Sequence, residues 1–348
     1  MKFLLQPISQ IFGKVAAARR AFYEKGFLKS YDLNAPVVSI GNLTVGGTGK
    51  TPLVSFVARV LAENGHRVCV LTRGYKRQNP NQRVVVSDGE QILADAQTSG
   101  DEPFELANKL LGVASVIADK NRAEAGLWAK KNLGATAFVL DDGFQHLRLK
   151  RNLDVVTVDA TNPFGNGKLL PAGILREPLE SLKRADVVVL TRANLSERIS
   201  NLKSEIKKNN SNCLILLAKN EIRELKPLAD FLKFSKSPNI HSALRIPHSA
   251  LASAFCALGN PAAFFMDLEK AGFKVVSTES FPDHYAYKQT DIEKLEQKAR
   301  ENGAKMLITT AKDAVKLEEM KFNLSCFVAG AETIFDDATP LLKLLKEL

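Results

Sequence analysis

The sequence has 348 residues, 45% of them hydrophobic and 25% charged, which is typical of a soluble globular protein of two domains, because single cores rarely grow past about 250 residues. An excess of 48 Lys and Arg over 38 Asp and Glu gives a formal net charge of +10, which favours anionic partners such as phosphates, anionic lipid or nucleic acid. Four widely spaced cysteines give no sign of a zinc site or a disulfide framework, and no apolar run reaches the roughly 20 residues that span a bilayer, so we expect a cytoplasmic protein.

The first predicted element is a basic amphipathic helix that begins at Pro7 and belongs to a segment over residues 1–30. Proline suits the first turn of a helix, and apolar residues then recur at steps of three and four. These residues are Ile8, Ile11, Val15, Ala18 and Phe22. The opposite side is polar and basic, which suits a helix that lies flat on an anionic bilayer. The same stripe is also typical of a helix docked on the protein's own core, and the pattern leaves both interpretations open.

Beyond this helix, short β-branched runs alternate with amphipathic helical stretches, which predicts an α/β protein. A larger domain is expected over residues 31–222 and a smaller α/β domain over residues 246–348. The polar stretch between them is rich in Lys, Pro and Ser, which predicts a linker over residues 223–245. The expected strands cover residues 37–40, 68–71, 84–86, 115–118, 137–140, 155–158, 187–190, 214–217, 252–257, 274–277, 306–309 and 325–328.

A glycine-rich loop, residues 41–52, follows the first strand and precedes a helix. In such a loop successive backbone N–H groups point at phosphate oxygens, and the helix contributes its positive N-terminal end. We therefore expect Lys50 to reach the β- and γ-phosphates of a nucleotide and Thr51 to hold Mg²⁺. Thr44 stands where the usual pattern has glycine, and the core from Gly46 to Thr51 instead resembles the variant loops of the partition and division-site ATPases. The alternative is a merely flexible loop. The residues expected to bind nucleotide are Thr44, Val45, Gly46, Gly47, Thr48, Gly49, Lys50 and Thr51.

Two pairs of adjacent carboxylates follow. Asp141 and Asp142 end an apolar strand, which is where P-loop enzymes place the carboxylate that supports Mg²⁺. Adjacent side chains on a strand point opposite ways, so only one should face the metal; a solvated acidic turn is the alternative. Asp101 and Glu102 lie in a loop that starts a helix, where a carboxylate could position an acceptor hydroxyl and take its proton, or could simply cap the helix.

Two further loops carry polar residues just after predicted strands. Arg176 lies in a turn-rich stretch and has the planar fork that suits a phosphate clamp, while a solvated ion pair with Glu177 is the alternative. His284 follows a strand of the smaller domain and could align a catalytic carboxylate or shuttle a proton, although an isolated histidine is more often structural.

In this order the motifs resemble the tetraacyldisaccharide 4′-kinase family over nearly the whole chain. Three further stretches share in the resemblance, at residues 72–75, 257–261 and 312–316. The resemblance implies a P-loop α/β/α sandwich with a second, smaller α/β domain. It also implies ATP and Mg²⁺ as cofactors and phosphorylation of the 4′-hydroxyl of a tetraacylated diglucosamine 1-phosphate in lipid A synthesis. The protein would be peripheral or monotopic at the cytoplasmic face of a Gram-negative inner membrane.

The resemblance also implies roles for individual residues. Asp101 would be the catalytic base, paired with His284, and Lys50 would assist transfer. Substrate would face Arg122, Arg176 and Glu177, and the metal would lie among Thr51, Glu102, Asp141 and Asp142. The expected partners are the acylated disaccharide 1-phosphate and the anionic membrane surface, with no nucleic acid and no obligate protein partner.

Two other functions share part of this pattern. A regulatory or assembly NTPase of the same P-loop branch would have a similar loop and no lipid acceptor. Residues 191–194 read Thr-Arg-Ala-Asn rather than the Asn-Lys-x-Asp guanine signature, which argues against a GTPase. A membrane-bound nucleotide-binding adaptor without catalysis would leave Asp101 and His284 as structural residues.

Overall fold

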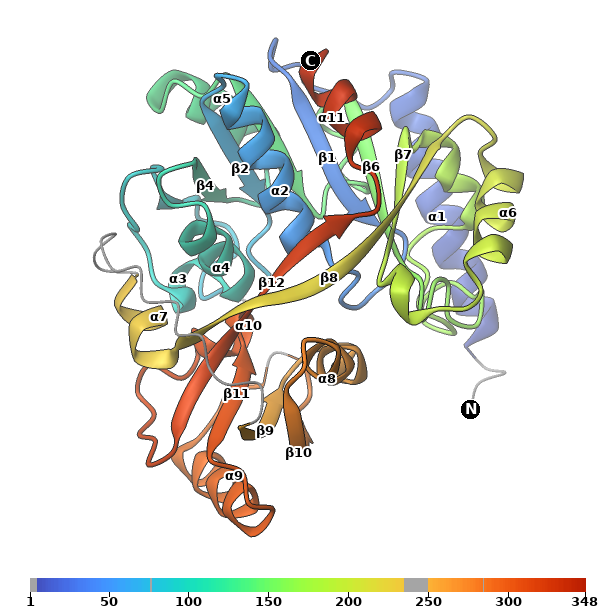
Figure 1. The fold of residues 1–348 in the computed structure, drawn as a ribbon. Coiled ribbons are helices and arrows are strands. Elements are labelled where there is room, and N and C mark those ends of the chain that lie inside the picture. The colour runs from blue at the N-terminus through green and yellow to red at the C-terminus, as the bar shows by residue number, and fades with distance from the viewer. Residues whose placement is uncertain (1–4, 76, 235–249, 284) are drawn as a thin grey trace.

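The computed structural model describes residues 5–75, 77–234, 250–283 and 285–348, and over this part of the chain it forms two lobes (Figure 1). The strands of the larger lobe are β1 (Val37–Asn42), β2 (Val68–Thr72), β3 (Val84–Ser87), β4 (Ala114–Ala118), β5 (Ala137–Asp141), β6 (Leu153–Asp159) and β7 (Val187–Thr191). The smaller lobe contains β9 (Leu251–Cys256), β10 (Lys274–Ser280) and β11 (Met306–Thr310), and two long strands connect the lobes, β8 (Leu214–Pro227) and β12 (Ser325–Phe335). All belong to one sheet of order β10-β9-β11-β12-β8-β7-β6-β1-β5-β2-β4-β3.

Helices cover both faces of the strands in each lobe. In the larger lobe they are α1 (Gln6–Glu24), α2 (Lys50–Glu63), α3 (Ala96–Ser99), α4 (Asp101–Lys109), α5 (Arg122–Asn132), α6 (Ile199–Asn209) and α11 (Thr339–Lys346), with 3₁₀ turns η1 (Leu179–Arg184) and η2 (Ala193–Leu195). In the smaller lobe they are α7 (Leu228–Phe234), α8 (Pro261–Lys270), α9 (Gln289–Glu301) and α10 (Ala311–Ala314). Side chains of α2, α4 and α11 share one core with the sheet of the larger lobe, and those of α5 and α6 pack on the opposite face. The larger lobe is therefore the expected α/β/α sandwich.

The central strand β1 explains where the site forms. It lies between β5 and β6 and is parallel to both. Val38 and Ile40 point into the core under α2, whereas Val37 points into the core under α5, so the strand is buried throughout. Strands covered by helices on both faces read as continuous apolar runs. Because these three strands are parallel, their carboxyl ends open at one edge of the sheet, and the loops that follow them meet there.

The expected linker is wrong for residues 223–234. Residues up to Pro227 continue β8, which pairs antiparallel with β12 from Phe335 opposite Ala218 to Phe327 opposite Pro227. The next residues form α7, and the remainder of the expected linker lies outside the described residues. Figure 1 shows β8 and β12 as a ribbon that runs from one lobe into the other. Such a ribbon is only half-buried and tolerates alternating Lys and Glu, so it lacks the apolar pattern by which the other strands are predicted.

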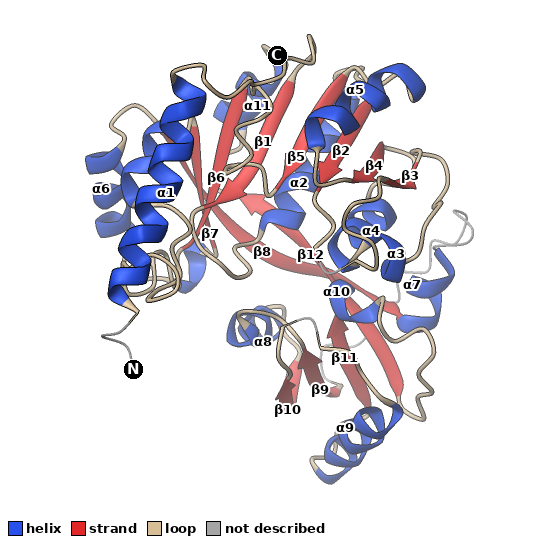
Figure 2. Ribbon diagram, turned by 180° about the vertical axis from the view of Figure 1, so that it is seen from behind, coloured by secondary structure: helices blue, strands red, loops and turns tan. Residues whose placement is uncertain are grey.

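The smaller lobe repeats the layered arrangement. Strands β9, β10 and β11 are parallel to one another, and β11 is parallel to β12. Ile292 and Leu295 of α9 pack on one face of these strands, while Leu268 of α8 packs on the other. The two helices therefore lie on opposite faces, and the loops at the carboxyl ends of the strands point towards the larger lobe (Figure 2).

Helix α1 attaches to the larger lobe through polar contacts. The Ala172 N–H donates a hydrogen bond to Ser9 Oγ at 3.0 Å, and Arg20 donates one to Ser181 Oγ at 3.0 Å. Ile11 and Val15 of the apolar stripe are each 62% exposed. The interpretation of a helix docked on its own core through this stripe is therefore wrong. None of the described helices combines the length and apolarity needed to cross a membrane.

Candidate active site

A cavity of about 1290 Å³ opens between the two lobes and extends along α1. From the larger lobe it is lined by residues 45–52, 72–75, 120–122, 145–148, Asp141, Asp142, Glu102, Arg176, Glu177 and Arg192. The smaller lobe contributes residues 258–260, 310–312 and Asp283, and α1 contributes Phe12, Val15, Ala16, Arg19, Arg20 and Tyr23. Motifs that are more than 200 residues apart in the sequence thus face one space.

The glycine-rich loop connects β1 to α2 and turns at two glycines with positive φ, Gly46 at 108° and Gly49 at 79°. Gly49 directly precedes α2, so the N-terminal end of this 14-residue helix points at the loop. Thr48 anchors the loop to the end of β7, since its carbonyl accepts a hydrogen bond from Thr191 Oγ1 at 2.9 Å. A Cβ added at Gly47 would meet nothing within 4 Å, so the backbone here is open to an approaching phosphate.

Two residues at the start of the loop are held by the stretch that carries Arg176. Thr44 is buried, pairs with Leu175 in an isolated bridge and does not line the cavity. The Val45 N–H donates to the Ile174 carbonyl at 2.8 Å, so this amide is already engaged. The six residues from Gly46 to Thr51 line the cavity together with the Val45 side chain.

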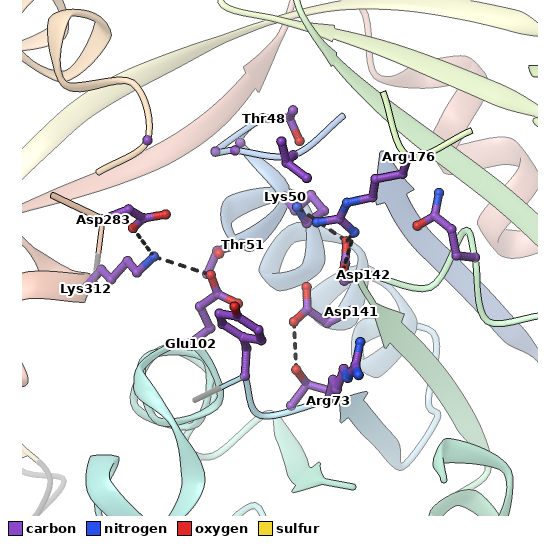
Figure 3. Close-up of a pocket in the computed structure, with 18 of the residues that line it drawn as sticks. Thr48, Lys50, Thr51, Arg73, Glu102, Asp141, Asp142, Arg176, Asp283 and Lys312 are labelled. Atoms are coloured by element: carbon purple, nitrogen blue, oxygen red, sulfur yellow. Dashed lines mark hydrogen bonds and ion pairs between the residues drawn. The ribbon is translucent and has the colours of Figure 1, made fainter. Parts of the chain in front are cut away.

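Asp141 and Asp142 are adjacent in the sequence, but their carboxylates contact different residues (Figure 3). Arg176 donates from one guanidinium nitrogen to both carboxylate oxygens of Asp142, at 2.9 and 2.7 Å, and Lys50 Nζ lies 3.6 Å from Asp142 Oδ1. Asp141 is buried, and its Oδ2 accepts a hydrogen bond from Thr72 Oγ1 at 2.8 Å. The backbone of Asp142 has a positive φ of 50°.

The electrostatics of the two carboxylates differ accordingly. Burial raises the pKa of Asp141 from 3.8 to about 6, and the nearby charges of Glu102 and Asp142 add to this. Burial acts on the pKa of Asp142 in the same direction, but Lys50 and Arg176 outweigh it and hold that pKa well below its usual range. Asp142 is therefore an anion balanced by two cations, whereas Asp141 is the carboxylate whose ionised form a bound cation would stabilise.

The other two residues expected to face substrate also have partners within the protein. Arg122 is buried, and its NH1 donates to the carbonyls of Asp141 and Asp142 at 2.9 and 3.0 Å. Burial lowers the pKa of Arg122, opposed by the two carboxylates. Glu177 is buried and accepts a hydrogen bond from Arg184 at 2.9 Å. Both side chains line the cavity, so these partners hold them in place at its wall.

Asp101 and Glu102 begin α4, and each meets a lysine of the smaller lobe. Lys316 Nζ lies 3.3 Å from Asp101 Oδ2. Lys312 Nζ lies 3.5 Å from Glu102 Oε1 and 3.0 Å from Asp283 Oδ1, as Figure 3 shows. Glu102 lines the cavity, and Asp101 is its neighbour in the first turn of α4. His284, the expected partner of Asp101, is outside the described residues, so that pairing stays a prediction.

Comparison with known proteins agrees with this geometry. A family model described as tetraacyldisaccharide-1-P 4′-kinase matches residues 1–348. The chain belongs to this kinase family. The kinase is 38% identical to the tetraacyldisaccharide 4′-kinase of Halothermothrix orenii, over 99% of this chain and 92% of that protein, and 39% identical to that of Geobacter metallireducens, over 97% and 95%.

A solved structure also resembles this kinase along its length. The "apo" form of LpxK from Aquifex aeolicus in complex with ATP superposes with a TM-score of 0.77 at 33% identity and covers 99% of this chain and 98% of its own. The expected P-loop α/β fold, the kinase family and transfer to an alcohol group in lipid A synthesis are thereby confirmed.

One group of the kinase site was not predicted from the sequence. Arg192 forms an ion pair with Asp159 and donates a hydrogen bond to the Gly47 carbonyl at 3.2 Å. Asn260 of the smaller lobe donates to the same Asp159 at 3.1 Å, so the phosphate loop is tied to both lobes. In the sequence analysis the segment around Arg192 is used only as evidence against guanine binding. Its place at the carboxyl end of a strand is nevertheless a signal, since ligands bind there in open α/β sheets.

Proposed function

We propose that this kinase transfers the γ-phosphate of Mg²⁺-bound ATP to the 4′-hydroxyl of a tetraacylated diglucosamine 1-phosphate, with the residues of the cavity in the roles described below. The observation that carries the proposal is the continuity of the cavity, which joins the phosphate loop to Arg19 and Arg20 of α1 and to that helix's apolar residues. One end suits a triphosphate, and the other suits an acidic lipid.

The triphosphate is proposed to lie on residues 46–51, where the backbone is open and the N-terminal end of α2 favours negative charge. Lys50 and Arg176 would contact the phosphoryl group that is transferred. Both cations are held by Asp142, and therefore need little reorganisation when the nucleotide binds. Preorganised charges of this kind provide most of the transition-state stabilisation in phosphoryl transfer.

Mg²⁺ is proposed to lie near Thr51, Glu102 and Asp141. The residues fit this ion, because Thr51, Glu102 and Asp141 line the same cavity and present hydroxyl and carboxylate oxygens, which are the ligands that Mg²⁺ prefers. Among the described residues no three acidic, histidine or cysteine side chains converge closely enough to hold a metal by themselves. Mg²⁺ usually takes only one or two carboxylates and completes its shell with water and phosphate oxygens. When bound, it would neutralise charge on the β- and γ-phosphates.

Asp101 is proposed to accept the proton of the acceptor hydroxyl, with His284 as its partner. The hydroxyl oxygen forms a bond to the γ-phosphorus while the bond from that phosphorus to the β,γ-bridging oxygen breaks. The products are the 4′-phosphorylated lipid, ADP and a proton on Asp101. Lys50 and Arg176 would stabilise the charge on the group in transfer.

The kinase assay separates these roles from those of a switch NTPase. Purified protein with γ-labelled ATP should label the acylated disaccharide 1-phosphate, and mass spectrometry should detect one added phosphate. Lys50→Met should reduce this transfer at least 100-fold, because removal of one preorganised charge from a transition state costs about 3 kcal/mol or more. Release of phosphate from ATP without labelled lipid would support the switch instead.

The kinase is proposed to bind the cytoplasmic face of the inner membrane through α1. A double substitution, Ile11→Glu with Val15→Glu, changes two side chains that are each 62% exposed, so it should leave the unfolding temperature unchanged. It should lower partitioning onto vesicles of phosphatidylglycerol and phosphatidylethanolamine more than tenfold, because burial of such a side chain contributes about 1.5–3 kcal/mol. Leu127→Glu on α5, where the side chain is 44% exposed, is the matched control. Equal partitioning of all three proteins would contradict the proposal.

A further inference from the structure

Two lysines of the smaller lobe meet the two carboxylates that begin α4. Lys312 of α10 pairs with Glu102, which lines the cavity, and Lys316, four residues later, pairs with Asp101, at 3.3 Å between Nζ and Oδ2. The four residues form a double contact between the lobes. The contact of Lys316 matters because its partner is the carboxylate to which the proposed function assigns the acceptor's proton.

Lys316 is largely buried and forms an ion pair within its own lobe. Its side chain is 11% exposed, and its ammonium lies 3.6 Å from Oδ1 of Asp313, a residue with no exposed side-chain surface. The other oxygen of Asp313 accepts hydrogen bonds from the Ala257 N–H at 3.0 Å and from Thr310 Oγ1 at 2.7 Å. A buried lysine has already lost the rotamer freedom of an exposed one, so its charge occupies a defined position. Asp313 therefore fixes Lys316, and Lys316 reaches across to the larger lobe.

We propose that Lys316 is a positioning residue for phosphoryl transfer: it holds one oxygen of Asp101 and so orients that carboxylate towards the acceptor hydroxyl. The proposal rests on the proposed function, in which Asp101 is the base. A base must lie within hydrogen-bond reach of the proton it removes, and a carboxylate that rotates freely reaches that geometry only part of the time. A residue of the smaller lobe, Lys316, thus fixes the orientation of the base, Asp101, which belongs to the larger lobe.

The test compares Lys316→Met, which keeps an unbranched side chain one atom shorter and removes the charge, with Lys316→Arg, which keeps the charge. Lys316→Met should lower kcat about 10- to 100-fold, with the KM for ATP within about twofold of wild type, because Lys316 does not line the nucleotide cavity. Lys316→Arg should recover at least a third of wild-type kcat. Lys305→Met changes an exposed lysine of the same lobe and should match wild type. If Lys316→Met melts early, Lys316→Gln takes its place.

A double-mutant cycle distinguishes positioning from a merely structural contact. If Lys316 acts through Asp101, then Lys316→Met should slow an Asp101→Asn enzyme by less than twofold, because the group it orients is already gone. Multiplicative losses in the double variant, or a fall in activity that follows the loss of folded protein, would overturn the proposal. Wild-type kcat in Lys316→Met would overturn it while leaving the kinase function intact. A wild-type chain that labels no lipid would overturn the proposed function and the role of Lys316 together.

Discussion

Replacement of Asp142 by asparagine tests whether Lys50 and Arg176 owe their positions to this carboxylate. The side chains have the same shape, but the amide carries no charge and presents an NH₂ group to one of its two cations. Arg176 contacts both oxygens of Asp142, at 2.9 and 2.7 Å, so at least one charge-assisted contact is lost whichever way the amide turns. A hydrogen bond to a charged group contributes about 1.5–3 kcal/mol. If that energy is lost in the transition state, kcat falls about 10- to 150-fold.

The effect on ATP binding should have the opposite sign. Removal of an anion beside the phosphate loop reduces repulsion of the triphosphate, so the KM for ATP should stay equal or fall. Steady-state transfer of label from ATP to the acylated disaccharide, with ATP varied, measures both constants. Asp32→Asn is the control, since Asp32 forms an exposed ion pair with Lys150 at 3.4 Å and neither residue lines the cavity. A kcat within threefold of wild type, or a loss carried entirely by a higher KM, would refute this reasoning.

Three other substitutions follow from packing and charge. Gly41→Ala should destabilise the protein by about 1–3 kcal/mol in urea unfolding, because its Cβ would lie 2.6 Å from the backbone nitrogen of Phe144. Gly47→Ala, where a Cβ meets nothing within 4 Å, should instead leave stability unchanged and weaken ATP binding in calorimetry; equal stability losses in the two variants would contradict this. Burial raises the pKa of Asp267 from 3.8 to about 6, so its contribution to stability is present below pH 4 and is lost as the pH rises through 6. Between pH 4 and pH 7.5 the free energy of unfolding of Asp267→Asn should therefore rise relative to that of wild type by up to about 3 kcal/mol. A difference between the two proteins that does not change with pH would argue against this pKa shift.

The phosphate loop and the strand-end carboxylates are predictable from sequence because each depends on neighbouring residues. An apolar strand, a run of glycines and the start of a helix are continuous along the chain from Val37 to Lys50, and so is the strand that ends at Asp141. The beginning of α4 at Asp101 also depends on neighbouring residues in the sequence. Local backbone preferences and the burial of one strand decide such features, and both are written in a few consecutive residues.

Features that depend on distant residues required the tertiary structure. The half-buried ribbon of β8 and β12 pairs residues that are at least 100 positions apart, and its polar sequence predicts a linker instead. The sequence also cannot say that Asp142 pairs with Lys50 and Arg176 while Asp141 faces Thr72, because adjacent carboxylates look alike until their neighbours are placed.

The sequence by itself determined the kinase fold of the larger lobe and identified the phosphate loop and the strand-end carboxylates that face the cavity. Only the packing of the two lobes decided which charges meet there, including the contact of Lys316 with Asp101. The physical reason is that charge pairing acts over a few ångströms in space, and sequence patterns report only on neighbours along the chain.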